Sequence, residues 1–301
     1  MITHVTIIGK GRVGESVGKV LGTRYEGLGT RDEGLGTGDQ MTLNVETLSA
    51  REFLHGTRAV VSGTSSLVPS TSSLVPSPSS LVPSPSSSIF LLACKDAFLP
   101  AVIQRLAEQY GERLAGSLVM HVNGSLGTDI LEPLRACGAM IAAAHPFQTF
   151  GSVDPSALNG IGWGVECDDD AWPLTEEFVK LTGGFPFRLP KTDPVSKRRY
   201  HAAAVAASNF TYAAYDLARG LANEAGIPAE TFLVPIMQRT LDNAAKAMHD
   251  GTPFALTGPL VRGDMDAVQR QLDAMPEHLR EQYIHLTDAL KEVIKRTASS
   301  E

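Results

Sequence analysis

The pattern of apolar residues changes its period within the first few positions of the chain. Val5, Ile7 and Ile8 form a short apolar run that stops at Gly9, and apolar residues then recur at helical intervals between positions 13 and 21. A short run followed by helical spacing is typical of a strand, a tight turn and a helix. The start of the chain therefore predicts the opening unit of an α/β fold.

Three glycines spaced as GxGxxG lie in the predicted turn. In such a unit the first glycine permits the turn, the second lets the backbone approach a pyrophosphate, and the third lets helix and strand pack closely. The helix N-terminus adds N–H groups that bind phosphates. The alternative is a glycine turn that serves an α/β fold without a nucleotide. The candidate cofactor-binding residues are those of the turn: Gly9, Lys10, Gly11, Arg12, Val13 and Gly14.

Strand-like and helix-like segments then alternate up to residue 190. The expected strands are 59–62, 89–93, 118–122, 140–144, 162–167 and 185–189, and the expected helices lie within 94–111, 128–137 and 171–182. This alternation predicts a parallel sheet with right-handed crossovers. We interpret residues 1–190 as a Rossmann dinucleotide-binding domain.

From Val195 the chain becomes rich in alanine and evenly apolar, which predicts a long helix in the middle of a helical domain or a dimer core. Further helices are expected at 229–249, 264–275 and 276–297. We interpret residues 191–301 as an all-α domain that contributes to substrate binding and forms a homodimer.

Two seven-residue repeats interrupt the first domain. Residues 20–40 hold three copies of a unit such as GLGTRDE, and the Ser/Pro-rich segment 65–88 begins with three copies of a unit such as SSLVPSP. Read on the opposite DNA strand, Gly-Thr-Arg-Asp-Glu-Gly can encode Ser-Leu-Val-Pro-Ser-Pro. We hypothesise that one stretch of DNA expanded here in both orientations, so that these low-complexity segments reflect the history of the gene rather than selected chemistry.

Charge and composition narrow the class of partner. Lys and Arg number 26 against 33 for Asp and Glu, a formal net charge of −7, which argues against nucleic acid or an anionic membrane as the main partner. The first strand leaves no room for a signal peptide, and no apolar run is long enough for a membrane span, so a cytoplasmic location is expected. The three cysteines lack metal-ligand spacing and are expected to be buried thiols, with no metal site.

Polar residues follow two of the expected strands, where ligands of open parallel sheets bind. His145 follows 140–144, and Ser125 closes the segment Asn-Gly-Ser after 118–122. A histidine with a pKa near neutrality could give a proton to the reacting oxygen or nitrogen, and the alternative is a hydrogen bond that fixes the His-Pro turn. His121, inside its strand, is expected to be structural.

A row of residues spaced by four, Lys197, His201, Val205 and Asn209, lies on one face of the long helix. Its polar members are candidates to face the nicotinamide and the substrate, and the alternative is a hydrogen-bonded helix in the core. The candidate catalytic residues are His145, Lys197, His201 and Asn209.

Six segments together resemble one bacterial family: GKGRVG at 9–14, the strand and KDAF at 89–98, HVNGS at 121–125, AAHPFQTF at 143–150, KRRYHAAAVAASN at 197–209 and GPLVRGD at 258–264. In the proteins that the chain resembles, a Rossmann-like domain precedes domain of unknown function 2520, and they are described as NADP oxidoreductases similar to the deazaflavin-dependent ones. The resemblance implies a 6-phosphogluconate dehydrogenase-like fold, with a helical C-terminal domain that commonly dimerises. In related dehydrogenases a lysine and an asparagine four residues later polarise the reacting oxygen. Lys197 matches that lysine, but His201 stands four residues on.

The cofactor is expected to be NADP rather than NAD. Asp32 and Glu33 lie near the distance of a ribose ligand, but inside a repeat that distance means little, and Arg24 and Arg31 of the same repeat are equally placed to meet a 2′-phosphate. Arg12, just after the second glycine, is placed to meet it as well. The sequence thus predicts an NADP(H)-dependent oxidoreductase that acts on a small polar carbonyl, imine or hydroxy compound. The alternative is a dinucleotide-binding sensor or scaffold without turnover.

Overall fold

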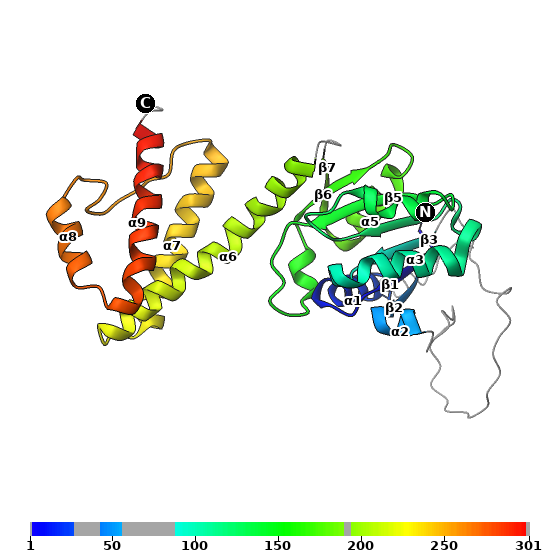
Figure 1. The fold of residues 1–301 in the computed structure, drawn as a ribbon, viewed down its shortest axis with the longest axis horizontal. Coiled ribbons are helices and arrows are strands. Elements are labelled where there is room, and N and C mark those ends of the chain that lie inside the picture. Colours follow the sequence, from blue (N-terminus) through cyan, green and yellow to red (C-terminus); the bar gives the residue numbers. More distant parts are fainter. Residues whose placement is uncertain (1, 27–42, 56–87, 190–193, 299–301) are drawn as a thin grey trace, which may run out of the picture. The chain divides into compact units, whose positions relative to one another are not determined.

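The computed structural model describes residues 2–26, 43–55, 88–189 and 194–298. Two compact units divide the chain, Met1–Ala204 and Val205–Glu301. The first contains the sheet and the second is helical, so the expected combination of an N-terminal Rossmann fold and an all-α C-terminal part is confirmed (Figure 1).

One seven-stranded sheet, in the order β2-β1-β3-β4-β5-β6-β7, forms the centre of the first unit. Its strands are β1 His4–Ile8, β2 Asn44–Leu48, β3 Ser88–Leu92, β4 Leu118–His121, β5 Met140–Pro146, β6 Gly162–Cys167 and β7 Phe185–Arg188. The pairs from β2 to β5 are parallel, as is β6 with β7.

The pairing of β5 with β6 corrects the expectation of an all-parallel sheet, because these two strands are antiparallel. A parallel neighbour needs a crossover connection that carries the chain back over the sheet, usually as an α-helix. Between β5 and β6 the chain forms only the short 3-10 helix η5, Pro155–Leu158, so β6 runs back along β5.

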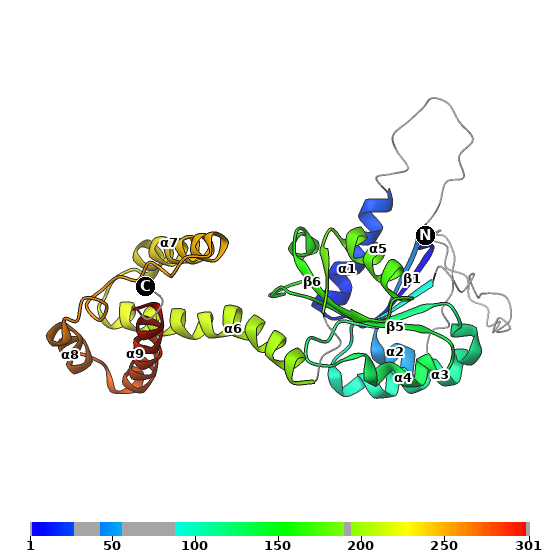
Figure 2. The same cartoon turned by 90° about the horizontal axis from the view of Figure 1, so that it is seen from above.

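Helices cover both faces of the sheet (Figure 2). One face packs against α1, Arg12–Glu26, and α5, Trp172–Thr182, and the other against α2, Ala50–His55, and α3, Leu99–Tyr110. Alternate residues of β1, β3, β4 and β5 enter the two cores, as in β1, where Ile7 lies in the first and Ile8 in the second.

Short helical turns complete this unit. The helix expected at 128–137 is a 3-10 turn, η4 Thr128–Leu131, followed by α4, Glu132–Arg135, while η2 Asp96–Phe98 and η3 Gly111–Leu114 flank α3. The thiol of Cys167 is buried as expected, whereas Cys94 and Cys137 are only half-buried.

The first repeat does not displace the strand that follows the first helix. Its first copy, residues 20–26, forms the end of α1, and β2 begins at Asn44, just after the third copy. Residues 27–40, the whole second repeat and the strand expected at 59–62 lie outside the described residues.

The second unit consists of the end of α6, Pro194–Glu224, with α7 Ala229–Asp250, α8 Met265–Asp273 and α9 Glu277–Ala298. Gln282 of α9 donates a hydrogen bond to the carbonyl of Ala213 of α6 over 2.8 Å. The sequence predicted that α6 would lie in the middle of a helical domain or in a dimer core, and in the single chain its Phe210 and Tyr212 are 66% and 63% exposed. In the part of the chain that the structure describes, no helix is both long and apolar enough to cross a bilayer.

Candidate functional site

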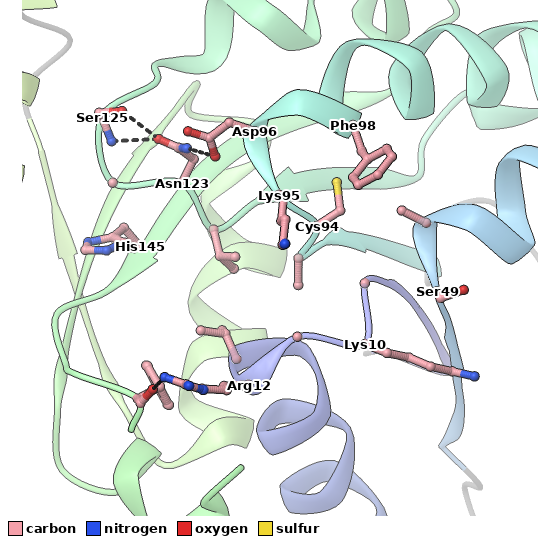
Figure 3. Close-up of a pocket in the computed structure, with 18 of the residues that line it drawn as sticks. Lys10, Arg12, Ser49, Cys94, Lys95, Asp96, Phe98, Asn123, Ser125 and His145 are labelled. Carbon is pink, nitrogen blue, oxygen red and sulfur yellow. Dashed lines mark hydrogen bonds between the residues drawn. The ribbon is translucent and has the colours of Figure 1, made fainter. Parts of the chain in front are cut away.

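A cleft of about 680 Å³ lies in the first unit, beside the glycine turn and the carboxyl ends of β1, β3 and β4 (Figure 3). It lies where open α/β sheets bind their ligands. The residues that line the cleft include Gly9, Lys10, Gly11, Arg12, Val13, Ser49, Arg51, Lys95, Asp96, Asn123, Gly124, Ser125, His145 and His201.

The three glycines of the turn are needed for different physical reasons. Gly9 has φ +138°, and a Cβ on it would lie 2.2 Å from the carbonyl oxygen of Ala93. A Cβ on Gly14 would lie 2.2 Å from the carbonyl oxygen of Gly9, so the fold itself requires both glycines. A Cβ on Gly11 would meet no described protein atom closer than 3.7 Å. Packing within the chain therefore does not explain Gly11, whereas close approach of a ligand does.

Positive side chains dominate the turn end of the cleft. The described lining residues include four cations, Lys10, Arg12, Arg51 and Lys95, and one carboxylate, Asp96. This excess of positive charge matches a polyanionic ligand such as a dinucleotide.

Two of these cations have partners within the chain. Arg12 donates a hydrogen bond to the carbonyl of Phe150 over 2.9 Å, and Lys10 forms an ion pair with Glu52 at 3.0 Å. Both side chains still line the cleft.

A capping box begins α2 and places two residues that the sequence reasoning missed. The Ser49 N–H donates to the Glu52 carboxylate over 2.7 Å, and the Ser49 hydroxyl accepts from the Glu52 N–H over 3.1 Å. The first bond is the main cause that lowers the pKa of Glu52 to about 2. Ser49 and Arg51 thereby line the cleft just after β2. The Ser-x-x-Glu pattern after an apolar run was the signal that could have found them.

The loop after β4 is organised by Asn123. Its Oδ1 accepts hydrogen bonds from the N–H of Ser125 over 2.7 Å and from the N–H of Leu126 over 2.9 Å. Its Nδ2 donates to Asp96 over 2.6 Å. These bonds hold Ser125 at the wall of the cleft, as expected from its place after the strand.

His145 and His201 meet at the other end of the cleft, on either side of Gly124. Their ring centroids are 5.4 Å apart. A Cβ on Gly124 would lie 2.3 Å from His201 Nδ1 and 2.9 Å from His145 Nε2, so only glycine leaves room for both rings. His145 is the sixth residue of β5 rather than the residue after the strand.

The protonation state of His145 differs from the expected near-neutral pKa. Burial, followed by the charges of His201 and Lys197, lowers the pKa of His145 to about 4. At neutral pH the ring is therefore uncharged, and it offers a hydrogen bond rather than the positive charge of an imidazolium.

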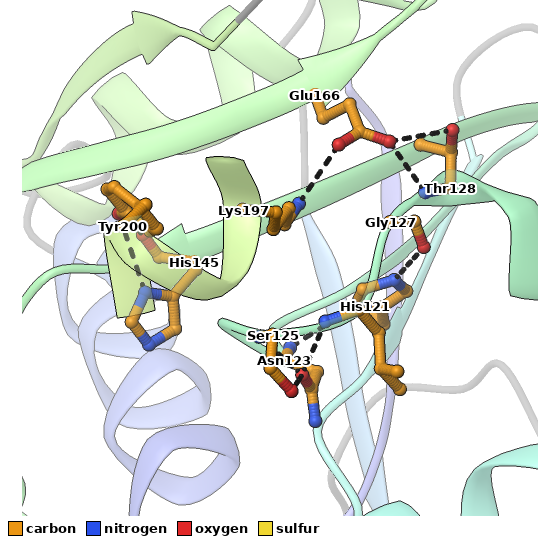
Figure 4. A network of polar contacts seen from close by, with 10 residues as sticks. His121, Asn123, Ser125, Gly127, Thr128, His145, Glu166, Lys197 and Tyr200 are labelled. Atoms are coloured by element: carbon orange, nitrogen blue, oxygen red, sulfur yellow. Dashed lines mark hydrogen bonds and ion pairs between the residues drawn. The ribbon is translucent and has the colours of Figure 1, made fainter. Parts of the chain in front are cut away.

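Lys197 lies in a buried ion pair rather than in the lining of the cleft. The residue is 6% exposed, and its Nζ lies 3.5 Å from Glu166 Oε2 (Figure 4). Glu166 also accepts hydrogen bonds from the N–H and hydroxyl of Thr128 over 2.8 and 3.1 Å. Burial is the main cause that lowers the pKa of Lys197.

The fourth candidate, Asn209, is an exposed residue of the second unit. His121, by contrast, is 1% exposed, and both ring nitrogens have partners, the Asn123 N–H at 3.2 Å and the Gly127 carbonyl at 2.9 Å. This agrees with a structural role. The structure thus brings His145, His201, Ser125 and the glycine turn together around one cleft.

No group of three or more potential metal-binding side chains occurs among the residues that the structure describes.

Two parts of the chain match known family models. Residues 58–146 match the model of a Rossmann-like domain, and residues 161–290 match the model of a domain of unknown function, DUF2520. A comparison with curated proteins gave no match.

Solved structures similar to the chain share its fold at low sequence identity. A candidate NADP oxidoreductase from Bacteroides fragilis has a TM-score of 0.62 and 19% identity, over 97% of this chain and 98% of that one. A pyrroline-5-carboxylate reductase from Coxiella burnetii has a TM-score of 0.51 and 15% identity, over 100% and 96%. A reductive aminase from Aspergillus terreus, in complex with NADPH and ethyl levulinate, has a TM-score of 0.53 and 16% identity, over 100% and 95%.

Proposed function

We propose that this protein, which belongs to the family that joins a Rossmann-like domain to DUF2520, is an NADP(H)-dependent oxidoreductase. Its substrate would be a small polar carbonyl, imine or hydroxy compound. The observation that carries the proposal is one cleft that holds the glycine turn, an excess of cations and two adjacent histidines. Two of the similar structures are named for reductions, one of them in complex with NADPH, which supports the same reaction class.

The residues of the turn fit a dinucleotide. The open space over Gly11 admits a pyrophosphate, and the first N–H groups of α1 lie beside it without intrahelical partners. Gly9 and Gly14 allow the chain to form the turn, and Lys10, Arg12 and Val13 of the turn line the cleft.

The residues after β2 favour NADP over NAD. An NAD-specific site usually has an acid here for the ribose hydroxyls, whereas an arginine accommodates the 2′-phosphate of NADP. Here Ser49 and Arg51 line the cleft, and the nearby Glu52 is engaged by Ser49 and Lys10. We therefore assign Ser49 and Arg51 to the 2′-phosphate.

The histidine end would take the substrate. The bound nicotinamide supplies or accepts the hydride, and the protein orients the reacting groups. Neutral His145 would donate a hydrogen bond to the reacting oxygen or nitrogen, with His201 and Ser125 beside it. Lys197, paired with Glu166, would act indirectly, because its positive charge helps to lower the pKa of His145 and so keeps that ring neutral.

The second unit would make the protein a homodimer. Large apolar side chains are exposed on α6 and α7 of the single chain, among them Phe210, Phe232, Ile236, Leu241 and Met248. Exposed apolar surface of this kind marks protein interfaces. Light scattering after gel filtration is expected to give the mass of two chains, and Leu241→Glu is expected to lower it.

Titration of the purified protein with NADPH, NADH and a reduced deazaflavin, followed by protein fluorescence, tests the cofactor assignment. We expect the tightest binding with NADPH. Arg51→Ala should weaken NADPH binding about 10- to 100-fold, the value of a charge-assisted hydrogen bond, and leave NADH binding unchanged. Lys19→Ala, which changes an exposed cation of α1, is the matched control. Absence of dinucleotide binding would refute the proposal.

Turnover separates an oxidoreductase from a dinucleotide-binding sensor. With a carbonyl or imine compound that oxidises NADPH, His145→Gln is expected to lower kcat about 100-fold or more while NADPH affinity stays the same. Loss of NADPH affinity in this variant would contradict the role assigned to His145.

A further inference from the structure

His145 has a polar neighbour that the sequence reasoning did not single out. The hydroxyl of Tyr200, on the first turns of α6, lies 3.4 Å from His145 Nδ1 and 3.4 Å from the His145 carbonyl oxygen (Figure 4). Both distances are longer than those of ordinary hydrogen bonds, and the single hydroxyl hydrogen is donated either to the carbonyl oxygen or to Nδ1. The other ring nitrogen of His145, Nε2, lies against Gly124 in the wall of the cleft.

The position of the Tyr200 hydroxyl depends on a glycine across the sheet. The antiparallel register places Gly164 of β6 directly opposite His145. A Cβ on Gly164 would lie 2.4 Å from the hydroxyl oxygen of Tyr200. The Tyr200 ring also packs against Phe147, with centroids 4.9 Å apart. Residues of two strands and one helix therefore hold this hydroxyl beside the histidine.

We propose that Tyr200 is a positioning residue that holds His145 as the tautomer with its proton on Nε2, directed into the cleft. The inference rests on the proposed function, because that function gives His145 its role. A hydroxyl that donates to Nδ1 leaves Nε2 as the protonated nitrogen of a neutral imidazole. Burial raises the pKa of Tyr200 to about 12, so the phenol keeps its proton at neutral pH.

A fixed Nε2–H narrows the substrate class. The group that faces it must accept a hydrogen bond, as a carbonyl oxygen or the nitrogen of a neutral imine does. A protonated iminium has no free lone pair on nitrogen and receives no such bond. The reaction that this site favours is thus the reduction of a neutral carbonyl or imine.

Nitrogen NMR of the histidine rings tests the tautomer without any substrate. The full chain, labelled with ¹⁵N-histidine, is recorded in long-range proton–nitrogen correlation spectra at pH 7.5, and His145→Gln identifies the His145 signals. We expect the wild-type ring to be protonated on Nε2. Tyr200→Phe should give a mixture of both tautomers and raise the pKa of His145, because the lost bond stabilised the neutral ring.

A second variant, Gly164→Ala, disturbs the same contact without changing Tyr200 itself. Its new methyl group pushes the Tyr200 hydroxyl away from His145, so it should also give a mixture of both tautomers. Tyr110→Phe removes the hydroxyl of a tyrosine that packs against Phe90 of β3, and it should change neither the tautomer nor the pKa of His145. His121 is an internal reference in every spectrum, because the Asn123 N–H fixes its Nδ1 as an acceptor.

A wild-type His145 with its proton on Nδ1, or one whose tautomer and pKa are the same in Tyr200→Phe, would overturn the proposal. The result is independent of the NADPH titration. A protein with the expected tautomer that binds no NADPH would refute the proposed function and leave the contact standing. A protein that binds NADPH but lacks the expected tautomer would refute the role of Tyr200 and leave the proposed function standing.

Discussion

The two ends of the cleft are built in different ways. The glycine turn at one end comes from one stretch of the chain, Gly9 to Gly14, and its glycines leave the backbone open to a ligand. The histidine end assembles Gly124, His145 and His201 from a loop, a strand and a helix that lie far apart in the sequence. The glycine turn is therefore specified by local sequence, whereas the histidine end exists only after the unit has folded.

The two ends also differ in their electrostatics. The cations at the turn end are exposed, so water screens them and their charges cost little in the free protein. Around the histidine end, His121 and Lys197 are buried and His145 is half-buried, and burial lowers the pKa of all three. Acid and charge deletion should thus affect stability mainly through the histidine end.

The largest effect is expected from acid. The pKa values of His121 and His145 are lowered from 6.5 to about 4 in the folded protein, so between pH 6.5 and 4 the unfolded chain binds more protons. Stability is therefore fully present above pH 6.5 and is lost as the pH falls towards 4, by up to about 3 kcal/mol for each ring. Urea unfolding followed by tryptophan fluorescence measures this, because both tryptophans, Trp163 and Trp172, lie in the first unit.

His145→Gln should remove about half of that acid dependence, whereas His249→Gln, at an exposed position of the second unit, should leave it unchanged. A free energy of unfolding that stays constant from pH 7.5 to 4.5 would contradict the electrostatic contrast between the two ends.

The next effect concerns the buried ion pair. Lys197→Met leaves the Glu166 carboxylate, which is 12% exposed, without its cation and should cost about 3–5 kcal/mol in the same unfolding measurement. Adding Glu166→Gln to Lys197→Met should restore part of that loss, because the double variant buries no net charge. If the double variant is as unstable as the sum of the single ones, Lys197 and Glu166 are not coupled.

The smallest effect on stability is expected at the turn. Gly14→Ala forces a Cβ to within 2.2 Å of the Gly9 carbonyl oxygen, so α1 must move away from the turn. We expect a loss of about 1–3 kcal/mol in the free energy of unfolding, the usual cost of overpacking, together with loss of NADPH binding.

Gly11→Ala is the matched control, since its Cβ meets only ordinary contacts in the protein. It should keep wild-type stability and still weaken NADPH binding. Equal destabilisation by the two substitutions would show that Gly11, like Gly14, serves the packing of the turn.

Local patterns predicted much of the fold, and long-range pairing explains what they missed. The strands around Ile7, Leu91 and Val119 stand out because their apolar runs are short and bounded. The reversal of β6 could not be predicted, because a strand reads the same in either direction. The strand β2 was overlooked beside the repeat, although the capping box of Ser49 and Glu52 marks its end.

At the site, too, local patterns were predictable and long-range contacts were not. The glycine turn was predictable because each of its parts is adjacent in sequence. Lys197 and His201 were singled out by their spacing, but no periodicity tells that Glu166 neutralises the first or that Tyr200 contacts His145. Those partners follow from sheet register and helix docking, which a single sequence does not display.

The order of the strands also determines where this gene can tolerate change in length. The described chain resumes after the two repeats at Leu43 and Ser88, at the amino ends of β2 and β3, whereas the cleft lies at the carboxyl ends of the sheet. We therefore expect copies gained or lost upstream of those strands to leave unchanged the strand register that brings the cleft residues together.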